Sequence, residues 1–170
     1  MDVQNAREET IQAYQLHAGV LLAYAHRLTR DEALAQDALQ ETFLRFFLAL
    51  MQGEEIQNAR AWLHRVAHNY VCEVLRSASI RKAVSLEDAG ENQLRDERAT
   101  PDNDRAPDWI EAARMLLAPR EWQCLQLRVE GFDYTEIATV MAIRPGTVAS
   151  LLHRATDKLR IRLQKKERPV

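Results

Sequence analysis

The sequence is poor in the residues that interrupt helices, with five glycines and five prolines among 170 residues. Runs of β-branched residues are also few, so strands are not expected and the fold class should be all-α. There are only two cysteines, Cys72 and Cys124, which lie far apart without metal-ligand spacing and suit buried thiols in a reducing compartment. No apolar segment follows a basic start, and none approaches the roughly 20 residues that cross a bilayer. We therefore expect a cytoplasmic helical protein without membrane insertion.

Sequence motifs typical of enzymes are missing as well. The sequence has no glycine-rich phosphate loop, no metal-ligand spacing and no pairing of a nucleophile with a base. The histidines are scattered over helical segments, and for two of them a plain surface position is expected: His64 and His68. We therefore expect a protein that is not an enzyme, with no cofactor, no metal and no small-molecule substrate.

The net charge of −2 conceals a pattern of alternating blocks. Residues 60–84 carry five basic and one acidic group, and residues 144–170 carry eight basic and two acidic groups. Acidic stretches separate them: residues 85–108 alone carry eight acidic and three basic groups. Two separated basic surfaces are typical of a protein that touches nucleic acid at two places.

Residues 134–159 show the pattern of a helix-turn-helix. A first helix is predicted from about Thr135, a turn at 142–144 follows, and Pro145 opens a second helix, because proline suits the first turn. Apolar residues at three- and four-residue steps predict the buried face of that second helix: Val148, Leu151, Leu152, Ala155 and Leu159. In a helix-turn-helix the second helix lies in the DNA major groove. An ordinary helical hairpin has the same spacing, so the pattern favours DNA binding without settling it.

Three longer helices are predicted upstream, over residues 8–28, 32–52 and 59–77. Asp31 and Asn58 are expected to cap the second and third of them, and Gly53 to end the second. The third helix places Arg, His and Asn side chains beside Trp62 and Tyr70, a combination that offers phosphate contacts and stacking faces to single-stranded nucleic acid. For Trp62, core packing and DNA contact both stay open.

Residues 83–107 have the composition of a flexible acidic linker between two helical domains. Asp108 is a candidate cap for a helix over 109–117. Pro119 then begins another helix, which ends at Gly131.

These segments, taken in series, resemble the bacterial sigma factors of the extracytoplasmic-function class. Residues 37–47 (DALQETFLRFF) look like the segment of that family that docks on the clamp helices of RNA polymerase. Residues 58–76 (NARAWLHRVAHNYVCEVLR) look like its promoter-melting and −10-reading segment, and residues 117–160 are similar to its C-terminal domain. The resemblance implies two small helical domains: a sigma region 2-like domain over 1–82 and a region 4-like helix-turn-helix domain over 108–170, joined by the linker 83–107.

The resemblance also implies roles for particular side chains, with core RNA polymerase and promoter DNA as partners. Those expected to bind core polymerase are Asp37, Gln40, Glu41 and Arg45. Those expected at the −10 element are Asn58, Arg60, Trp62, Arg65, Asn69, Tyr70 and Arg76. Those expected at the −35 element are Arg144, Thr147, Ser150, His153, Arg154 and Lys158. An anti-sigma factor is a further partner that the family suggests.

The sequence departs from the family pattern in its recognition helix. After the GTV motif the family often has lysine, serine and arginine, where this chain has Ala149, Ser150 and Leu151, and Thr156 replaces a common basic residue. Fewer phosphate contacts predict a −35 interaction that is weaker, or that is made with a different sequence. Ala142 stands where the turn commonly has glycine, and a left-handed backbone there would cost alanine about 1 kcal/mol.

Two other interpretations remain open at this point. A transcription factor of the response-regulator type would share the pattern of the C-terminal half, but it requires an α/β domain upstream, where this sequence shows helical spacing. A sigma-like adaptor would bind polymerase without reading a promoter.

Overall fold

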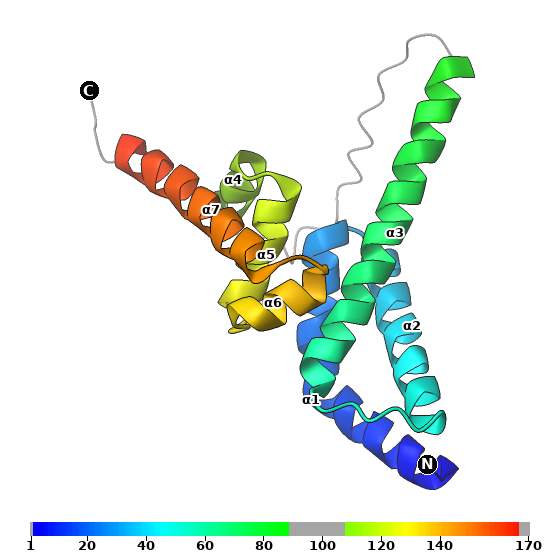
Figure 1. The fold of residues 1–170 in the computed structure, drawn as a ribbon. Helices are drawn as coiled ribbons and strands as arrows, with labels where there is room; N and C mark the ends of the chain where they lie inside the picture. The colour runs from blue at the N-terminus through cyan, green and yellow to red at the C-terminus, as the bar shows by residue number, and fades with distance from the viewer. Residues whose placement is uncertain (1, 89–107, 167–170) are drawn as a thin grey trace.

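The computed structural model describes residues 2–88 and 108–166, and all regular secondary structure in these two ranges is helical (Figure 1). The prediction of an all-α protein is therefore confirmed. The helices are α1 (Val3–Thr29), α2 (Glu32–Met51), α3 (Ala59–Asp88), α4 (Asp108–Leu116), α5 (Pro119–Val129), α6 (Tyr134–Met141) and α7 (Pro145–Lys166). None of these helices is long and apolar enough to cross a membrane.

Helices α1, α2 and α3 form an N-terminal unit around one apolar cluster. Leu21 of α1, Phe46 of α2 and Leu63 of α3 are at most 1% exposed and meet in its centre. The predicted caps are confirmed: the Asp31 carboxylate accepts from Leu34 N at 3.0 Å, and the Asn58 side chain accepts from Ala61 N at 3.0 Å. The sequence thus positioned both helix starts correctly, because Asp and Asn satisfy the free N–H groups of a first turn.

Helix α3 is longer than predicted. It continues to Asp88, whereas the spacing predicted an end near 77 and a linker from residue 83. No glycine or proline occurs between residues 77 and 88, so nothing in the backbone interrupts the helix there. The remainder of the predicted linker, residues 89–107, lies outside the described residues.

Helices α4 to α7 form the C-terminal unit, and backbone geometry at two turns sets its shape. Gly131 ends the turn after α5 with φ +89°, and Ala142 lies between α6 and α7 with φ 52°. The left-handed turn expected at Ala142 is therefore present. Asp133 caps α6 by accepting from the N–H groups of Thr135 and Glu136, both at 2.8 Å. The helix-turn-helix that the sequence predicted is confirmed.

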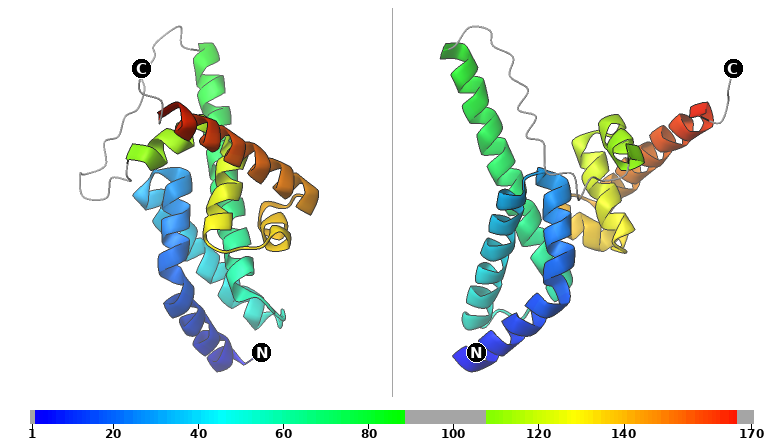
Figure 2. Two further views of the ribbon diagram at one scale, coloured as in Figure 1. Left: turned by 90° about the vertical axis from the view of Figure 1, so that its left-hand side faces the viewer. Right: turned by 180° about the vertical axis from the view of Figure 1, so that it is seen from behind.

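The two units pack directly against each other. Figures 1 and 2 show α6 lying beside α3, and a single buried cluster crosses between them, with Tyr24 and Val71 on one side and Phe132 and Met141 on the other. Arg30 at the end of α1 also forms an ion pair with Glu111 of α4. The surface of the N-terminal unit that faces α6 is therefore a protein contact rather than a solvated face.

Candidate nucleic-acid interface

The N-terminal end of α3 holds several of the residues predicted to bind DNA, and two of them contact the C-terminal unit. The Asn58 amide donates to Glu136 Oε1 at 3.1 Å. Arg60 donates to the backbone carbonyl of Glu130, and its guanidinium lies 3.9 Å from the centre of the Phe132 ring, in a cation–π geometry. Two expected −10 contacts therefore have intramolecular partners in this arrangement.

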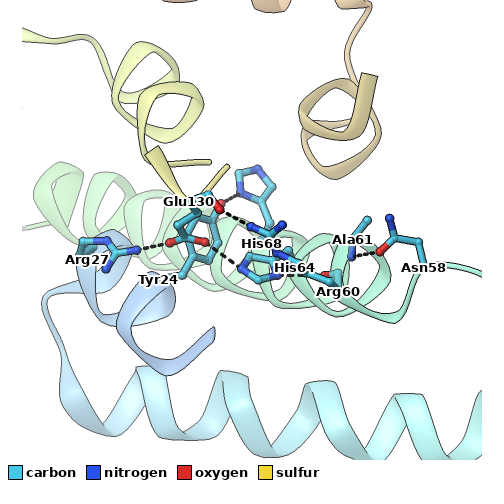
Figure 3. Close-up of polar contacts among 8 residues, drawn as sticks. All are labelled: Tyr24, Arg27, Asn58, Arg60, Ala61, His64, His68 and Glu130. Carbon is cyan, nitrogen blue, oxygen red and sulfur yellow. Dashed lines mark hydrogen bonds and ion pairs between the residues drawn. The ribbon is translucent and has the colours of Figure 1, made fainter. Parts of the chain in front are cut away.

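Glu130 is the centre of the contact between the units (Figure 3). One oxygen of its carboxylate forms an ion pair with Arg27, and the other lies 3.0 Å from His64 Nε2. The second ring nitrogen of His64 lies 2.9 Å from the carbonyl oxygen of Arg60, so it must carry a proton and donate. The Glu130 side chain is only 9% exposed, so this anion is nearly enclosed.

The expectation of a surface position for His64 and His68 was wrong. Both are buried, because the C-terminal unit and α1 cover this face of α3. His68 Nδ1 lies 2.9 Å from the Tyr24 hydroxyl, and Cys72 Sγ lies 3.5 Å from Nε2. Burial, with the nearby charge of Arg120, lowers the pKa of His68 to about 4. The sequence did contain a signal for this, since both histidines fall at helical steps from Ala61 and Val71, which are buried.

The other residues predicted at the −10 element have mixed surroundings. Trp62 lies edge-on to Phe46, with ring centres 5.5 Å apart, and its indole Nε1 donates to Glu54 at 3.2 Å. Part of the indole is therefore packed against the core. Tyr70 packs partly against the shared core, and Arg65 is half-buried. Asn69 and Arg76 are exposed and line an open cavity of about 430 Å³ between the two units, together with Arg120 and Gln123.

The recognition helix α7 exposes part of the predicted −35 surface. Arg144, Thr147, Ser150 and His153 are exposed along its first turns. Arg154 and Lys158 are also partly exposed, but both bind Glu121, at 3.5 Å and 2.7 Å.

Glu121 is a buried carboxylate that ties the recognition helix to the start of α5. It accepts from Ala118 N at 3.0 Å in addition to Lys158. The hydrogen bond from Lys158 is the main cause that lowers the pKa of Glu121, with the Ala118 N–H and the charge of Arg154 adding to it. The position of the two basic side chains is therefore fixed within the unit before any DNA is present.

The reading of Leu151 as a lost phosphate contact was wrong. Its side chain is 5% exposed and packs in the core, so a basic residue at this position would not face DNA. Ala149 is exposed, and Thr156 is exposed while its hydroxyl donates to Leu152 O at 2.6 Å. The recognition helix has therefore lost fewer phosphate-contacting positions than the sequence analysis predicted.

Helix α2 presents the residues predicted to bind polymerase. Asp37, Gln40 and Arg45 are exposed, and Arg45 Nε lies 2.7 Å from the Glu41 carboxylate one turn earlier. Two leucines that the sequence analysis did not single out lie at four-residue steps from Gln40: Leu44 is 54% exposed and Leu48 46%. The polar residues and these leucines together form the α2 face, a surface with both charge and apolar area.

Comparison with known proteins matches each unit to a family description. Residues 13–80 match "Sigma-70 region 2", and residues 108–159 match "Sigma-70, region 4". The ECF RNA polymerase sigma factor SigL of Mycobacterium tuberculosis is 38% identical over 156 residues, covering 89% of this chain and 86% of that protein. The RNA polymerase sigma-H factor of Pseudomonas aeruginosa is 32% identical over 164 residues, covering 85% of this chain and 84% of that protein.

A solved structure shares the fold. The sigma factor RpoE from Bartonella quintana, in complex with the anti-sigma factor NepR, superposes with a TM-score of 0.70 at 22% identity. The match covers 95% of this chain and 99% of that chain.

Proposed function

This chain belongs to the extracytoplasmic-function sigma factors of bacterial RNA polymerase, and we propose that its two helical units divide promoter recognition between them. The protein binds core RNA polymerase and directs initiation at specific promoters. Residues 1–82 serve as the unit for polymerase and the −10 element, and residues 108–170 as the unit for the −35 element. The observation that carries this proposal is the succession of a region 2 match and a region 4 match on two helical units of one chain.

The −35 element is read by the exposed side of α7. Thr147, Ser150 and His153 lie on the first three turns of this helix, where a helix-turn-helix meets base edges. Arg154 and Lys158 follow further along, and their ion pairs with Glu121 leave 58% and 42% of the side chains exposed for phosphate contact. Arg144 precedes the helix and adds a further exposed cation.

The −10 element is melted and held by α3 and the loop before it. Asn58, Arg60 and Asn69 supply hydrogen-bond donors, Trp62 and Tyr70 supply aromatic faces, and Arg65 and Arg76 supply positive charge. Extruding a base costs a few kcal/mol, which contacts of this kind offset. Because Asn58 and Arg60 are engaged by Glu136, Glu130 and Phe132, this role requires the two units to move apart.

Core polymerase binds the α2 face. Asp37, Gln40, Glu41 and Arg45 provide directional polar contacts, and Leu44 and Leu48 provide apolar area that is otherwise left in water. Phe43 and Phe46 are 7% and 1% exposed, so they support the helix from inside rather than contact a partner.

The chemistry of transcription belongs to polymerase in this proposal, and the chain supplies recognition without a catalytic group. The cytoplasm, where polymerase works, is the compartment in which it acts. An anti-sigma partner is in keeping with the family. The response-regulator alternative required an α/β domain before the helix-turn-helix; residues 3–88 form three helices instead, so that alternative is wrong.

Run-off transcription tests the proposal. Purified core polymerase is incubated with and without the protein on a library of promoter fragments, and transcripts are sequenced. We expect transcripts from a subset that shares two spaced motifs. Binding to core without any transcript would instead identify an adaptor, and no binding to core would refute the assignment of the N-terminal unit.

A further inference from the structure

Three basic side chains from two helices converge on Glu130. Arg27 comes from the last turn of α1, and Arg60 and His64 come from the first turns of α3. Arg27 and His64 bind the carboxylate, while Arg60 binds the carbonyl of the same residue (Figure 3). All three groups belong to the N-terminal unit, and their shared ligand belongs to the C-terminal unit. The N-terminal unit therefore contains a preformed anion site that its own neighbour occupies.

The positive potential of this site reaches a further residue. The pKa of His17, on α1, is lowered by burial and then by the positive charges of His64 and Arg60. The Arg27 side chain remains 38% exposed although it is paired, so one edge of the site is open to solvent. A carboxylate and a phosphate oxygen accept the same donations from guanidinium and imidazole N–H groups.

We propose that Arg27, Arg60 and His64 form a binding site for a backbone phosphate of single-stranded promoter DNA, and that Glu130 fills this site while the two units are packed together. The inference rests on the proposed role of the N-terminal unit in DNA binding. It adds Arg27 and His64 to the nucleic-acid surface and makes Glu130 an internal competitor for it. Asn58 is engaged on the same side by Glu136, so separation of the units frees both contacts at once.

Competition of this kind has a reciprocal consequence. If packing of the C-terminal unit excludes the phosphate, binding of DNA must weaken the packing by the same factor. Removing the charge of Glu130 should therefore strengthen DNA binding by the free protein, by a factor on the order of 5 to 150, the usual range for coupled sites.

The first experiment measures binding of a short, fluorescein-labelled, single-stranded oligonucleotide of mixed sequence to the full chain by fluorescence anisotropy. We expect Glu130→Gln to bind at least about fivefold more tightly than the unaltered protein. The matched control is Glu8→Gln, which makes the same change of charge at an exposed position near the start of α1 and should shift affinity little. Equal affinities of Glu130→Gln and Glu8→Gln would overturn the proposal.

The second experiment assigns the site to Arg27. In the Glu130→Gln background the ion pair between Arg27 and residue 130 is already absent. Arg27→Ala in this background therefore removes the proposed phosphate contact alone. We expect weaker binding and a reduction of about 0.7 in the slope of log affinity against log salt. An unchanged slope would show that the oligonucleotide binds elsewhere and would overturn the assignment.

A third measurement uses the unaltered protein and does not depend on the folding of a variant. Amide hydrogen exchange across residues 130–132 should quicken when the oligonucleotide is added at saturation, because Glu130 is displaced from its partners. Slower or unchanged exchange there would contradict the competition. Run-off transcription separates this inference from the proposed function: initiation with core polymerase can succeed while all three of these results fail.

Discussion

The burial of His68 gives the protein a specific sensitivity to acid. The pKa of His68 is about 4 in the folded chain, against about 6.5 for an exposed histidine, so the unfolded chain takes up the proton first as pH falls. Stability contributed by this group is therefore unchanged above about pH 7 and falls as pH decreases from 6.5 toward 4. At pH 5 the loss should be about 2 kcal/mol, since each unit of pKa difference is worth about 1.4 kcal/mol.

Urea unfolding followed by circular dichroism measures this loss at a series of pH values between 5 and 7.5. The comparison is with His68→Gln, which keeps a side chain able to hydrogen-bond Tyr24 but cannot be protonated in this range. The pH dependence of the difference between the two proteins isolates the histidine from carboxylates such as Glu121, which also weaken the fold in acid. Parallel stability curves for the two proteins would refute the reasoning, because the burial of His68 would then carry no proton linkage.

Three further predictions concern particular side chains. Ala142→Gly should raise the free energy of unfolding by about 1 kcal/mol, because φ is 52° at this position, and thermal melting would detect the change. Ala149→Lys should strengthen binding of the full chain to duplex −35 DNA and steepen the slope of log affinity against log salt by about 0.9, because Ala149 is exposed. Leu151→Lys should instead lower the melting temperature, since the side chain at this position is buried. Leu44→Ala and Leu48→Ala should weaken binding to core polymerase in a pull-down titration while changing the free energy of unfolding by less than about 0.5 kcal/mol. A loss of stability without a loss of binding would contradict the role of the α2 face in binding polymerase.

The sequence predicted the individual helices well because their determinants are local. Asp31, Asn58 and Pro119 mark helix starts by their chemistry at the first turn, and the apolar spacing of α6 and α7 defines their buried sides. The helix-turn-helix followed from the same rules. The start of α1 was misplaced, because the helix begins at Val3 and not at residue 8. The end of α3 was also misplaced, since its acidic and basic composition resembles a linker although it contains no helix-breaking residue.

The contact between the units could not be predicted in the same way. The helical spacing of His64 and His68 indicates which side of α3 they lie on, but the groups that bury them come from the second unit and from α1, with Glu130 lying 66 residues beyond His64. No local pattern indicates which of several charged residues will meet across such a distance. The three-dimensional arrangement is also what makes Arg27 and Glu130 functional candidates, because the sequence analysis assigned neither of them a binding role.

In the proposed function, two units of one chain read two elements of a promoter at a fixed separation. The direct measurement takes one promoter fragment that supports run-off transcription with this protein and core polymerase, and inserts about half a helical turn, roughly five base pairs, between the two motifs. We expect transcription to be lost on the lengthened fragment although both motifs are intact. Undiminished transcription from that fragment would contradict it, because recognition would then not depend on both units binding together.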